Sequence, residues 1–550
     1  MLVLLCVFFW LTDLLATASP AGRTNGSFEL SVIHFNDFHA RFDQINENGG
    51  SCKKESECVG GFSRLYTQIK KIREENPKSI LLNAGDTFQG TLWYSIGRWN
   101  LTQHFMNKLN IDAEVLGNHD FDDGIAGVVP YIKSLNHPVV ASNIDDSLEP
   151  DIQRTYTKST IIERDGKKIG VIGVITYFCA EISHTEKLKF LPVSPSVNEE
   201  AERLVREEGV FTNIVLSHAA YEVDQIIAQN ASEKISLIVG GHSHSYLYTG
   251  DKPPGTEPVV GPYPTIVESK NKKKILIVQA SAFSRYLGNI TVFFDENGEV
   301  SDYSGAPIYL DGSVPQDEEI NKELLPWKKM VDELGDRVVG SSLVDLSNVD
   351  CDRKECTLGN FITDATVYSF TKSPPPGAWT EVALSVINAG GLRTSIGIGN
   401  ITYSDVTISQ PFLNTLDMGE IEGRYLKELL EFSSEDLIQV SGMKVEMNFD
   451  RPLNDRVVSV KVRCQNCTIP RYEYLDLNKT YRIAVCSFLR KGGNGFTVLS
   501  DNLKNVRVGQ LDIDAVMDYL AHRSPIYQEE EGRLVLSGEM KKRRIQTGSV

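Results

Sequence analysis

The sequence predicts an α/β protein of two domains, and three observations lead to this prediction. The 550 residues are 41% hydrophobic and 23% charged, the composition of a globular chain long enough for more than one core. From residue 30 to about 309, short apolar runs alternate with amphipathic stretches, the pattern of βα units on a largely buried sheet. The second half has its own apolar runs at 382–387, 456–462 and 481–487, enough for a separate mixed α/β core.

A charged segment separates the two predicted domains. Residues 316–340 carry apolar side chains at helical spacing, so we expect a helical connector with a break at Pro326. The predicted first domain is 27–315, the second domain is 341–538, and a polar tail occupies 539–550.

The N-terminus has the features of a secretory signal peptide. An apolar run at 2–10 is followed by small residues at 16–18, so we expect residues 1–18 to be removed and the protein to be secreted and extracellular. The alternative is a retained N-terminal anchor, because the segment lacks Lys and Arg and Asp13 interrupts it. No apolar run follows the basic cluster at 541–544, so we expect no C-terminal membrane anchor.

The cysteines and sequons agree with an oxidising compartment. Three short spacings suggest disulfides, namely Cys52–Cys58, Cys351–Cys356 and Cys464–Cys467. Cys179 and Cys486 lie in apolar, strand-like runs, so we expect buried free thiols there, with a long-range bridge as the alternative. Zinc bound by the clustered pairs is a further alternative. Asn-X-Ser/Thr sequons, which predict a glycoprotein, occur at Asn25, Asn100, Asn230, Asn289, Asn400, Asn466 and Asn478.

The formal net charge of −17 argues against nucleic acid as a partner, because such binding usually needs a concentrated basic face. A small anionic substrate would need local compensation by metal ions or arginines.

Five motifs in the first half share one layout, in which an apolar, strand-like run ends in metal-binding or catalytic residue types. The motifs are Asn36-Asp37-Phe38-His39, Gly85-Asp86, Gly117-Asn118-His119-Asp120-Phe121-Asp122, Ser217-His218 and Gly240-Gly241-His242-Ser243-His244. Because loops after the carboxyl ends of strands gather at one edge of an open α/β sheet, we expect all five to converge on a single cleft.

The side chains that would meet in this cleft are mixed nitrogen and oxygen donors. They are the carboxylates Asp37 and Asp86, the imidazoles His39, His218, His242 and His244, and the amide of Asn118. Such a set suits zinc, manganese or iron better than magnesium or calcium. The donors exceed what one ion needs, so we predict two divalent ions about 3.5–4 Å apart, bridged by Asp86. We expect zinc, with manganese or calcium as the alternatives.

His119 needs a separate role, because Asn118 beside it already offers a ligand and adjacent side chains in an extended segment point opposite ways. We predict that a charged His119 stabilises negative charge that grows on a phosphoryl group, and that Asp122 orients it. The alternative for Asp122 is a helix cap or turn residue. His34 lies inside an apolar run and is expected to be structural.

These residues, in this order, resemble the metallophosphoesterase core of the 5′-nucleotidase family, which includes ecto-5′-nucleotidases and the secreted salivary apyrases of blood-feeding arthropods. The resemblance extends over residues 30 to 535. It implies a metallophosphoesterase βα sandwich followed by a mixed α/β nucleotide-binding domain. It further implies one ion at Asp37, His39, Asp86 and His244, a second at Asp86, Asn118, His218 and His242, and a catalytic pair of His119 with Asp122. The family usually has Glu where this chain has Asp120.

The resemblance also implies a nucleotide site in the second domain. Its substrate-binding residues would be Asn388, Arg393, Phe412, Phe488, Asn494 and Arg353. Phe412 and Phe488 offer flat faces for a base and Arg393 a forked donor for phosphate, although core packing is the alternative for the phenylalanines. The family commonly has an acidic residue at the position of Asn494, so we expect weaker affinity for ribose. In the ecto-nucleotidases an arginine directly follows the first cysteine of the short bridge. Here Asp352 follows Cys351, and Arg353 comes next.

The resemblance leaves the substrate open among extracellular nucleotides. We expect an apyrase that converts ATP and ADP to AMP and phosphate, which in saliva would inhibit platelet aggregation during blood feeding. The alternative is a 5′-nucleotidase that converts AMP to adenosine. An alternative of another class is a catalytically silent nucleotide-binding or adhesion protein, which the complete ligand set argues against. Family enzymes often rotate one domain against the other, and we place such a hinge at 316–340.

Overall fold

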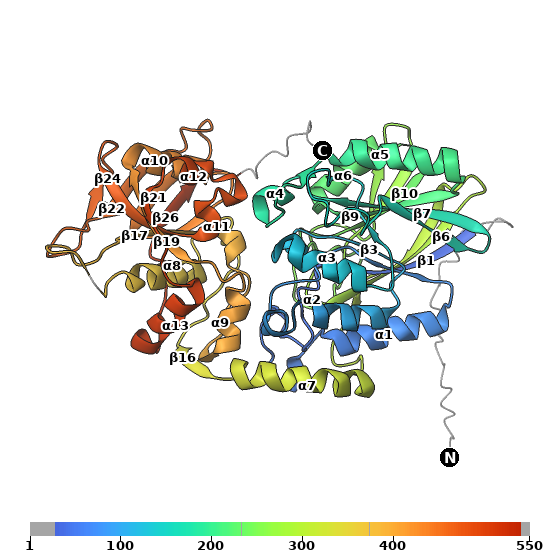
Figure 1. Ribbon diagram of the computed structural model, residues 1–550, viewed down its shortest axis with the longest axis horizontal. Coiled ribbons are helices and arrows are strands. Elements are labelled where there is room, and N and C mark those ends of the chain that lie inside the picture. The colour runs from blue at the N-terminus through green and yellow to red at the C-terminus, as the bar shows by residue number, and fades with distance from the viewer. Residues whose placement is uncertain (1–27, 233, 373, 541–550) are drawn as a thin grey trace, which may run out of the picture.

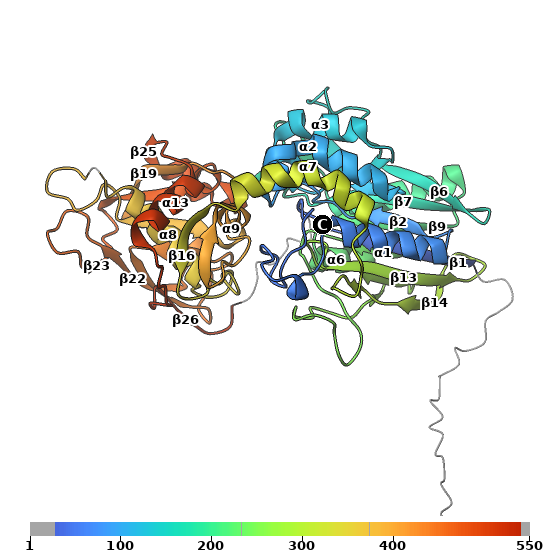
Figure 2. The ribbon, with the colours of Figure 1, turned by 90° about the horizontal axis from the view of Figure 1, so that it is seen from below.

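The computed structural model describes residues 28–232, 234–372 and 374–540. The expected signal peptide, the sequon at Asn25 and nearly all of the expected polar tail lie outside these residues. The described chain forms two lobes joined by the long helix α7 (Glu318–Gly335). Helix α7 reaches from one lobe to the other in both views (Figures 1 and 2).

In the described residues, the first lobe is a sandwich of two facing sheets. One sheet contains β1 (Phe28–Phe35), β2 (Ile80–Asn83), β3 (Ala113–Val115), β4 (Val139–Val140), β13 (Tyr286–Phe294), β14 (Val300–Gly305) and β15 (Ile308–Tyr309). The other contains β6 (Ser159–Arg164), β7 (Lys167–Ile175), β9 (Thr212–His218), β10 (Ile235–Gly240), β11 (Thr265–Glu268) and β12 (Lys274–Val278). The short strands β5 (Ile144–Asp145) and β8 (Lys189–Phe190) pair separately.

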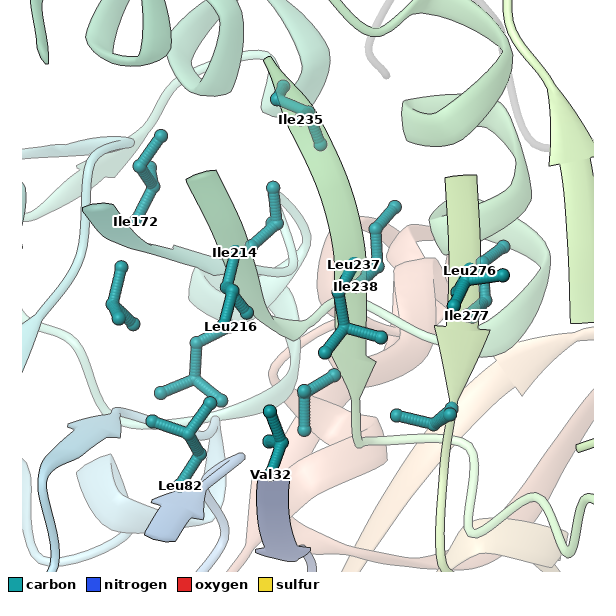
Figure 3. Packing of buried hydrophobic residues seen from close by; sticks show 14 of the residues in the cluster. Val32, Leu82, Ile172, Ile214, Leu216, Ile235, Leu237, Ile238, Leu276 and Ile277 are labelled. Carbon is teal, nitrogen blue, oxygen red and sulfur yellow. The ribbon is translucent and has the colours of Figure 1, made fainter. Parts of the chain in front are cut away.

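The core between these sheets explains why the central strands have unbroken apolar runs. Val32 and Leu82 of the first sheet face Ile214, Leu216 and Leu237 of the second, and all of them are fully buried (Figure 3). Strands β1, β2 and β3 run parallel, as do β7, β9 and β10. Parallel strands covered on both faces have no solvent side and therefore lack polar alternation.

Helices cover the outer faces of both sheets. The first sheet packs against α1 (Phe62–Glu75), α2 (Leu92–Met106) and α3 (Gly124–Ser134), and the second against α5 (Val193–Arg203) and α6 (Tyr221–Asn230). The short helix α4 (Cys179–Ile182) follows β7. Cys179 therefore begins a helix, which corrects the strand-like interpretation of its surroundings.

The expected break at Pro326 is wrong, because α7 continues through this residue. A proline inside a helix leaves the carbonyl four residues earlier without its usual donor. Here that residue is Lys322, which is exposed like Pro326 itself, so water can reach the carbonyl that has lost its partner. The buried face of α7, with Ile320, Leu324 and Val331, keeps the helix on the first lobe.

The second lobe has a mixed α/β core of its own. Its larger sheet contains β17 (Leu384–Asn388), β19 (Leu416–Glu422), β20 (Ile438–Ser441), β24 (Thr480–Cys486) and β25 (Lys504–Arg507). A second sheet contains β21 (Met443–Asn448), β22 (Val457–Arg463), β23 (Tyr472–Tyr474) and β26 (Leu534–Ser537), and β16 (Val338–Ser342) pairs with β18 (Gly399–Thr402). The helices are α8 (Thr357–Ser369), α9 (Tyr403–Ser409), α10 (Gly423–Phe432), α11 (Ser487–Arg490), α12 (Thr497–Asn502) and α13 (Asp512–Arg523). The predicted α/β fold class is confirmed.

The disulfides expected from short spacings, Cys52–Cys58, Cys351–Cys356 and Cys464–Cys467, are present. Cys179 and Cys486 are buried free thiols, as expected. None of the helices in the described residues combines the length and the apolar character needed to cross a membrane.

Candidate dinuclear metal site

The five motifs lie directly after β1, β2, β3, β9 and β10, at the carboxyl ends of parallel strands, where His218 is itself the last residue of β9. Their side chains meet where the edges of the two facing sheets adjoin. The chain turns sharply after each strand at this edge, and the backbone φ angles show these turns. Five donor residues, Asp37, His39, Asp86, His242 and His244, have left-handed φ values between 48° and 72°. Such conformations are strained for residues with side chains and concentrate at functional sites.

Two groups of donors form within this cluster. Asp37, His39 and His244 make one group, and Asp86, His218 and His242 make the other, with donor atoms in each group within 4.8 Å of one another. Asp86 lies between the groups, since its Oδ2 is 3.2 Å from His218 Nε2 and 3.6 Å from His39 Nε2. The predicted bridging residue thus occupies the central position.

The outer contacts of two imidazoles direct their other ring nitrogens toward the cluster. His218 Nδ1 lies 2.6 Å from the carbonyl of Ala84 and His39 Nδ1 lies 3.1 Å from that of Phe88. A proton on each Nδ1 directs the Nε2 lone pair into the cluster. Asn118 Oδ1 is buried without a hydrogen-bond partner in the described residues, and the buried His218 Nε2 has the Asp86 carboxylate 3.2 Å away. A buried polar atom needs a partner, so this donor set fits divalent cations.

The electrostatics of the cluster also favour cations. Burial alone raises the pKa of the Asp86 carboxyl, but His218 and His119 outweigh burial and hold that pKa well below its ordinary value. Burial lowers the pKa of the His242 imidazole to about 3 and that of His39 well below its ordinary value. His218 differs, because burial lowers the pKa of its imidazole but Asp86 and Asp37 outweigh burial and raise that pKa to about 10. The carboxylates therefore attract positive charge to this position, and a divalent cation bound there would replace the proton of His218.

His119 and Asp122 form a hydrogen-bonded pair beside the cluster. His119 Nδ1 is 2.8 Å from Asp122 Oδ2, and both side chains are mostly buried. Burial lowers the pKa of the His119 imidazole, but Asp122 and Asp86 outweigh it and raise that pKa above its ordinary value. The backbone N–H of His119 donates to Asp86 Oδ1 at 2.8 Å, which ties the pair to the donor groups.

Two of the residues expected to bind substrate reach the cluster from the second lobe. Arg393 Nη2 lies 3.2 Å from His39 Nε2, and the Phe412 ring stacks on the His119 ring with centroids 5.3 Å apart. The Arg393 guanidinium also lies over the Phe412 ring. An anionic group entering here would meet a cation and a flat apolar face together.

The other substrate-site residues lie further back in the second lobe. The backbone N–H of Phe488 donates to Asn414 Oδ1 at 3.1 Å, which brings Phe488 close to the segment that carries Phe412. Asn494 donates to Asp436 at 3.0 Å, and Asn388 is almost fully buried. Arg353 differs, because its side chain is 62% exposed and its described partner is the neighbouring Asp352.

Asp120, to which the sequence assigns no role, organises the site. Its Oδ1 accepts hydrogen bonds from the backbone of Thr87 and Phe88, and its Oδ2 accepts one from Gly117. The fully buried carboxylate therefore joins the loop of Asp86 to the loop of Asn118.

His34 is structural as expected, since it is buried within β1 and its Nε2 lies 2.9 Å from the Tyr263 hydroxyl.

A βα sandwich with paired Asp and His groups at its strand ends defines a metallophosphoesterase with a dinuclear divalent metal site. The sequence profile of the calcineurin-like phosphoesterases matches residues 30–246, and that of the 5′-nucleotidase C-terminal domain matches residues 338–501. The chain belongs to the 5′-nucleotidase family of metal-dependent phosphohydrolases, which confirms the resemblance seen in its motifs.

Full-length relatives support this assignment. An apyrase of Tabanus yao is 47% identical over 92% of this chain and 93% of its own length. The 5′-nucleotidase of Rattus norvegicus is 34% identical over 96% of this chain and 94% of its own. A crystal structure of a 5′-nucleotidase precursor from Thermus thermophilus superposes with a TM-score of 0.86, at 31% identity over 93% of this chain and all of that one.

Proposed function

We propose that this protein is a secreted apyrase that hydrolyses extracellular ATP and ADP to AMP. The observation that carries the proposal is the meeting of two donor groups with Arg393 and Phe412 from the second lobe. Hydrolysis adds water across a terminal P–O bond, so ATP gives ADP and phosphate, and ADP gives AMP and phosphate. The preference for ATP and ADP over AMP is supported by the 47% identity to the apyrase of Tabanus yao.

In this proposal Asp37, His39, Asp86 and His244 hold one ion. The second ion is held by Asp86, Asn118, His218 and His242. When bound, such a pair supplies Lewis acidity that lowers the pKa of water and offsets phosphoryl charge. We propose zinc for both positions, with manganese or calcium as the alternatives.

The chain's own residues would orient the substrate and stabilise the negative charge that grows on the phosphoryl group. His119, held by Asp122, donates a hydrogen bond to a phosphoryl oxygen on which negative charge grows, and stabilises the transition state more than the ground state. Arg393 binds a neighbouring phosphate with its forked donors. Phe412 and Phe488 hold the base between their rings, and Asn388, Asn494 and Arg353 complete the proposed substrate site.

The alternative substrate is AMP, which is favoured by the similarity to 5′-nucleotidases. The deciding measurement is phosphate release from ATP, ADP and AMP separately by the purified protein, with added Zn²⁺, Mn²⁺ or Ca²⁺ and then with excess chelator. Release from ATP and ADP but not from AMP, abolished by the chelator, is the expected result. Release from AMP would establish a 5′-nucleotidase, and release from none would favour a silent binding protein.

A further inference from the structure

The carboxylate of Asp122 is held on two sides. Its Oδ2 contacts His119 Nδ1, and its Oδ1 accepts a hydrogen bond from the Ser183 hydroxyl at 2.8 Å. The backbone carbonyl of Asp122 accepts a further bond from His184 Nδ1 at 2.9 Å. Ser183 and His184 belong to a separate segment, about sixty residues along the chain, so none of the five motifs contains them.

Ser183 occupies a defined place between the two lobes. It directly follows α4 with an extended backbone (φ −151°, ψ −177°) and donates its own N–H to the carbonyl of Cys179. Helix α4 contacts the turn Gly493–Gly495, which carries Asn494. Figure 1 shows α4 at the edge of the first lobe, facing the second. The hydroxyl therefore reaches Asp122 from a segment that is packed on its other side by the second lobe.

We propose that Ser183 is a positioning residue for the His119–Asp122 pair, an inference that rests on the proposed role of this pair in hydrolysis. A carboxylate can rotate about its Cβ–Cγ bond. A hydroxyl donor on one oxygen fixes this rotation and keeps the other oxygen on His119 Nδ1. The imidazole then presents its opposite nitrogen in one direction. Loss of the hydroxyl leaves Asp122 free to turn away, and His119 loses orientation without losing its side chain.

This role predicts a particular kinetic signature. If His119 stabilises charge mainly in the transition state, misorientation lowers kcat and leaves KM unchanged. A hydrogen bond to a charged group at this partly exposed site predicts a loss in kcat of about tenfold for Ser183→Ala. Ser183→Thr keeps the hydroxyl and restores kcat to within about twofold. Ser196→Ala is the matched control. The Ser196 hydroxyl, on helix α5, donates to the carbonyl of Pro192 just before that helix, so the variant leaves both constants unchanged.

The test measures kcat and KM for ADP with full-length, metal-loaded protein, for Ser183→Ala and Asp122→Asn singly and combined. If Ser183 acts through Asp122, adding Ser183→Ala to Asp122→Asn causes no further loss. An equal further loss in that background, a change in KM alone, or an unchanged kcat in Ser183→Ala would each overturn the inference. Wild-type protein that releases no phosphate from any nucleotide would instead overturn the proposed function, and this inference with it.

Discussion

Gly117 allows the loop of Asn118 to approach the backbone and the carboxylate of Asp86 closely. A Cβ at Gly117 would lie 2.1 Å from Asp86 Oδ1 and 2.3 Å from its backbone nitrogen. Both distances are shorter than any real Cβ contact, and the backbone of Asp86 itself has a strained φ of 55°. The carboxylate that lies between the two donor groups therefore depends on the absence of a side chain thirty-one residues away.

Substitution of this glycine should disable the site without touching a ligand. We expect Gly117→Ala to displace the Asp86 carboxylate and to lower both metal affinity and activity by about 10- to 100-fold, as losses of supporting contacts do. Gly312→Ala is the control, because a Cβ there meets open space. Metal analysis and phosphate release should fall together in the first variant, and a fully loaded, active Gly117→Ala would contradict this explanation.

A second residue, Asp224, gives a dependence of stability on pH. Burial raises the pKa of its carboxyl to about 8, and Oδ2 has no hydrogen-bond partner in the described residues. Because the folded pKa lies above the unfolded one, folding favours the protonated form, and stability is lost as pH rises from about 4 to about 8.

Asp224→Asn removes this charge while the side-chain oxygen can still accept from Ser217. We expect the variant to gain stability relative to wild type between pH 5 and pH 8, by up to about 4 kcal/mol. Urea unfolding of both proteins at several pH values measures the difference. A difference in unfolding free energy that does not change with pH would show that the pKa of Asp224 is the same in the folded protein as in the unfolded chain.

Residues that act through their own chemistry were predictable from sequence, whereas residues that act through contacts were not. Asp86 and His218 follow apolar runs and have the chemistry of ligands, so pattern and residue type together indicated them. Asp120 and Ser183 hold backbone amides or another side chain in place. Aspartate and serine do this in many turns, and nothing in the local sequence distinguishes these two from the rest.

At the scale of single elements, the strands were predicted well and the connector less so. An apolar run between covered faces has one stable outcome, which is a buried strand. Pro326 permits two outcomes, because a proline inside a helix loses one hydrogen bond and clashes with the carbonyl four residues earlier, and packing of the rest of the helix can outweigh that cost. That balance depends on how the buried face of α7 packs on the first lobe, and the sequence around Pro326 does not specify it.

Helix α9 gives a prediction at this scale. Its N-cap Thr402 accepts from the backbone of Asp405, whose side chain accepts from the backbone N–H of Thr402, so the two form a capping box. Thr402 is also the last residue of the sequon at Asn400. We expect Thr402→Ala to lower the free energy of unfolding by about 1 kcal/mol and to abolish any glycan at Asn400.

Two variants separate these effects in urea unfolding and mass spectrometry. Asn400→Gln removes the sequon alone and should leave the unfolding free energy of unglycosylated protein unchanged. Thr402→Ser retains both the cap and the sequon. If Asn400→Gln destabilises as much as Thr402→Ala does, the cap contributes nothing.

At the scale of the whole molecule, the metal donors all come from the first lobe, and the second lobe adds Arg393 and Phe412 to them. Arg393 and Phe412 approach His39 and His119 across the interface, and Lys53 Nζ donates to the carbonyl of Asn400 at 2.9 Å. No periodicity or spacing in the sequence predicts such contacts, since they join residues that are hundreds of positions apart. Only the family resemblance indicated that the second domain contributes to the same site.

A cross-link between the lobes tests whether they must separate during turnover. Gly50 lies in the first lobe with an ordinary φ, and a Cβ placed on it would lie 3.3 Å from Cγ2 of Thr394 in the second. In a disulfide the Cβ of one cysteine lies about 3 Å from the Sγ of the other, close to this Cβ-to-Cγ2 distance. Gly50→Cys with Thr394→Cys should therefore join the lobes on oxidation. The native Cys52–Cys58 bridge is close by, and peptide mapping must show that it stays intact.

If products leave only when the lobes move apart, the oxidised double variant should complete a first turnover and then stall. We expect its steady-state phosphate release to fall about tenfold or more, and to recover when the new bridge is reduced. The two single variants, treated with the same oxidant and reductant, control for damage to Arg393 beside Thr394 and for reduction of native bridges. Full steady-state activity in the cross-linked protein would mean that nucleotides enter and leave with the lobes held as they are in this structure. Helix α7 would then not act as a hinge.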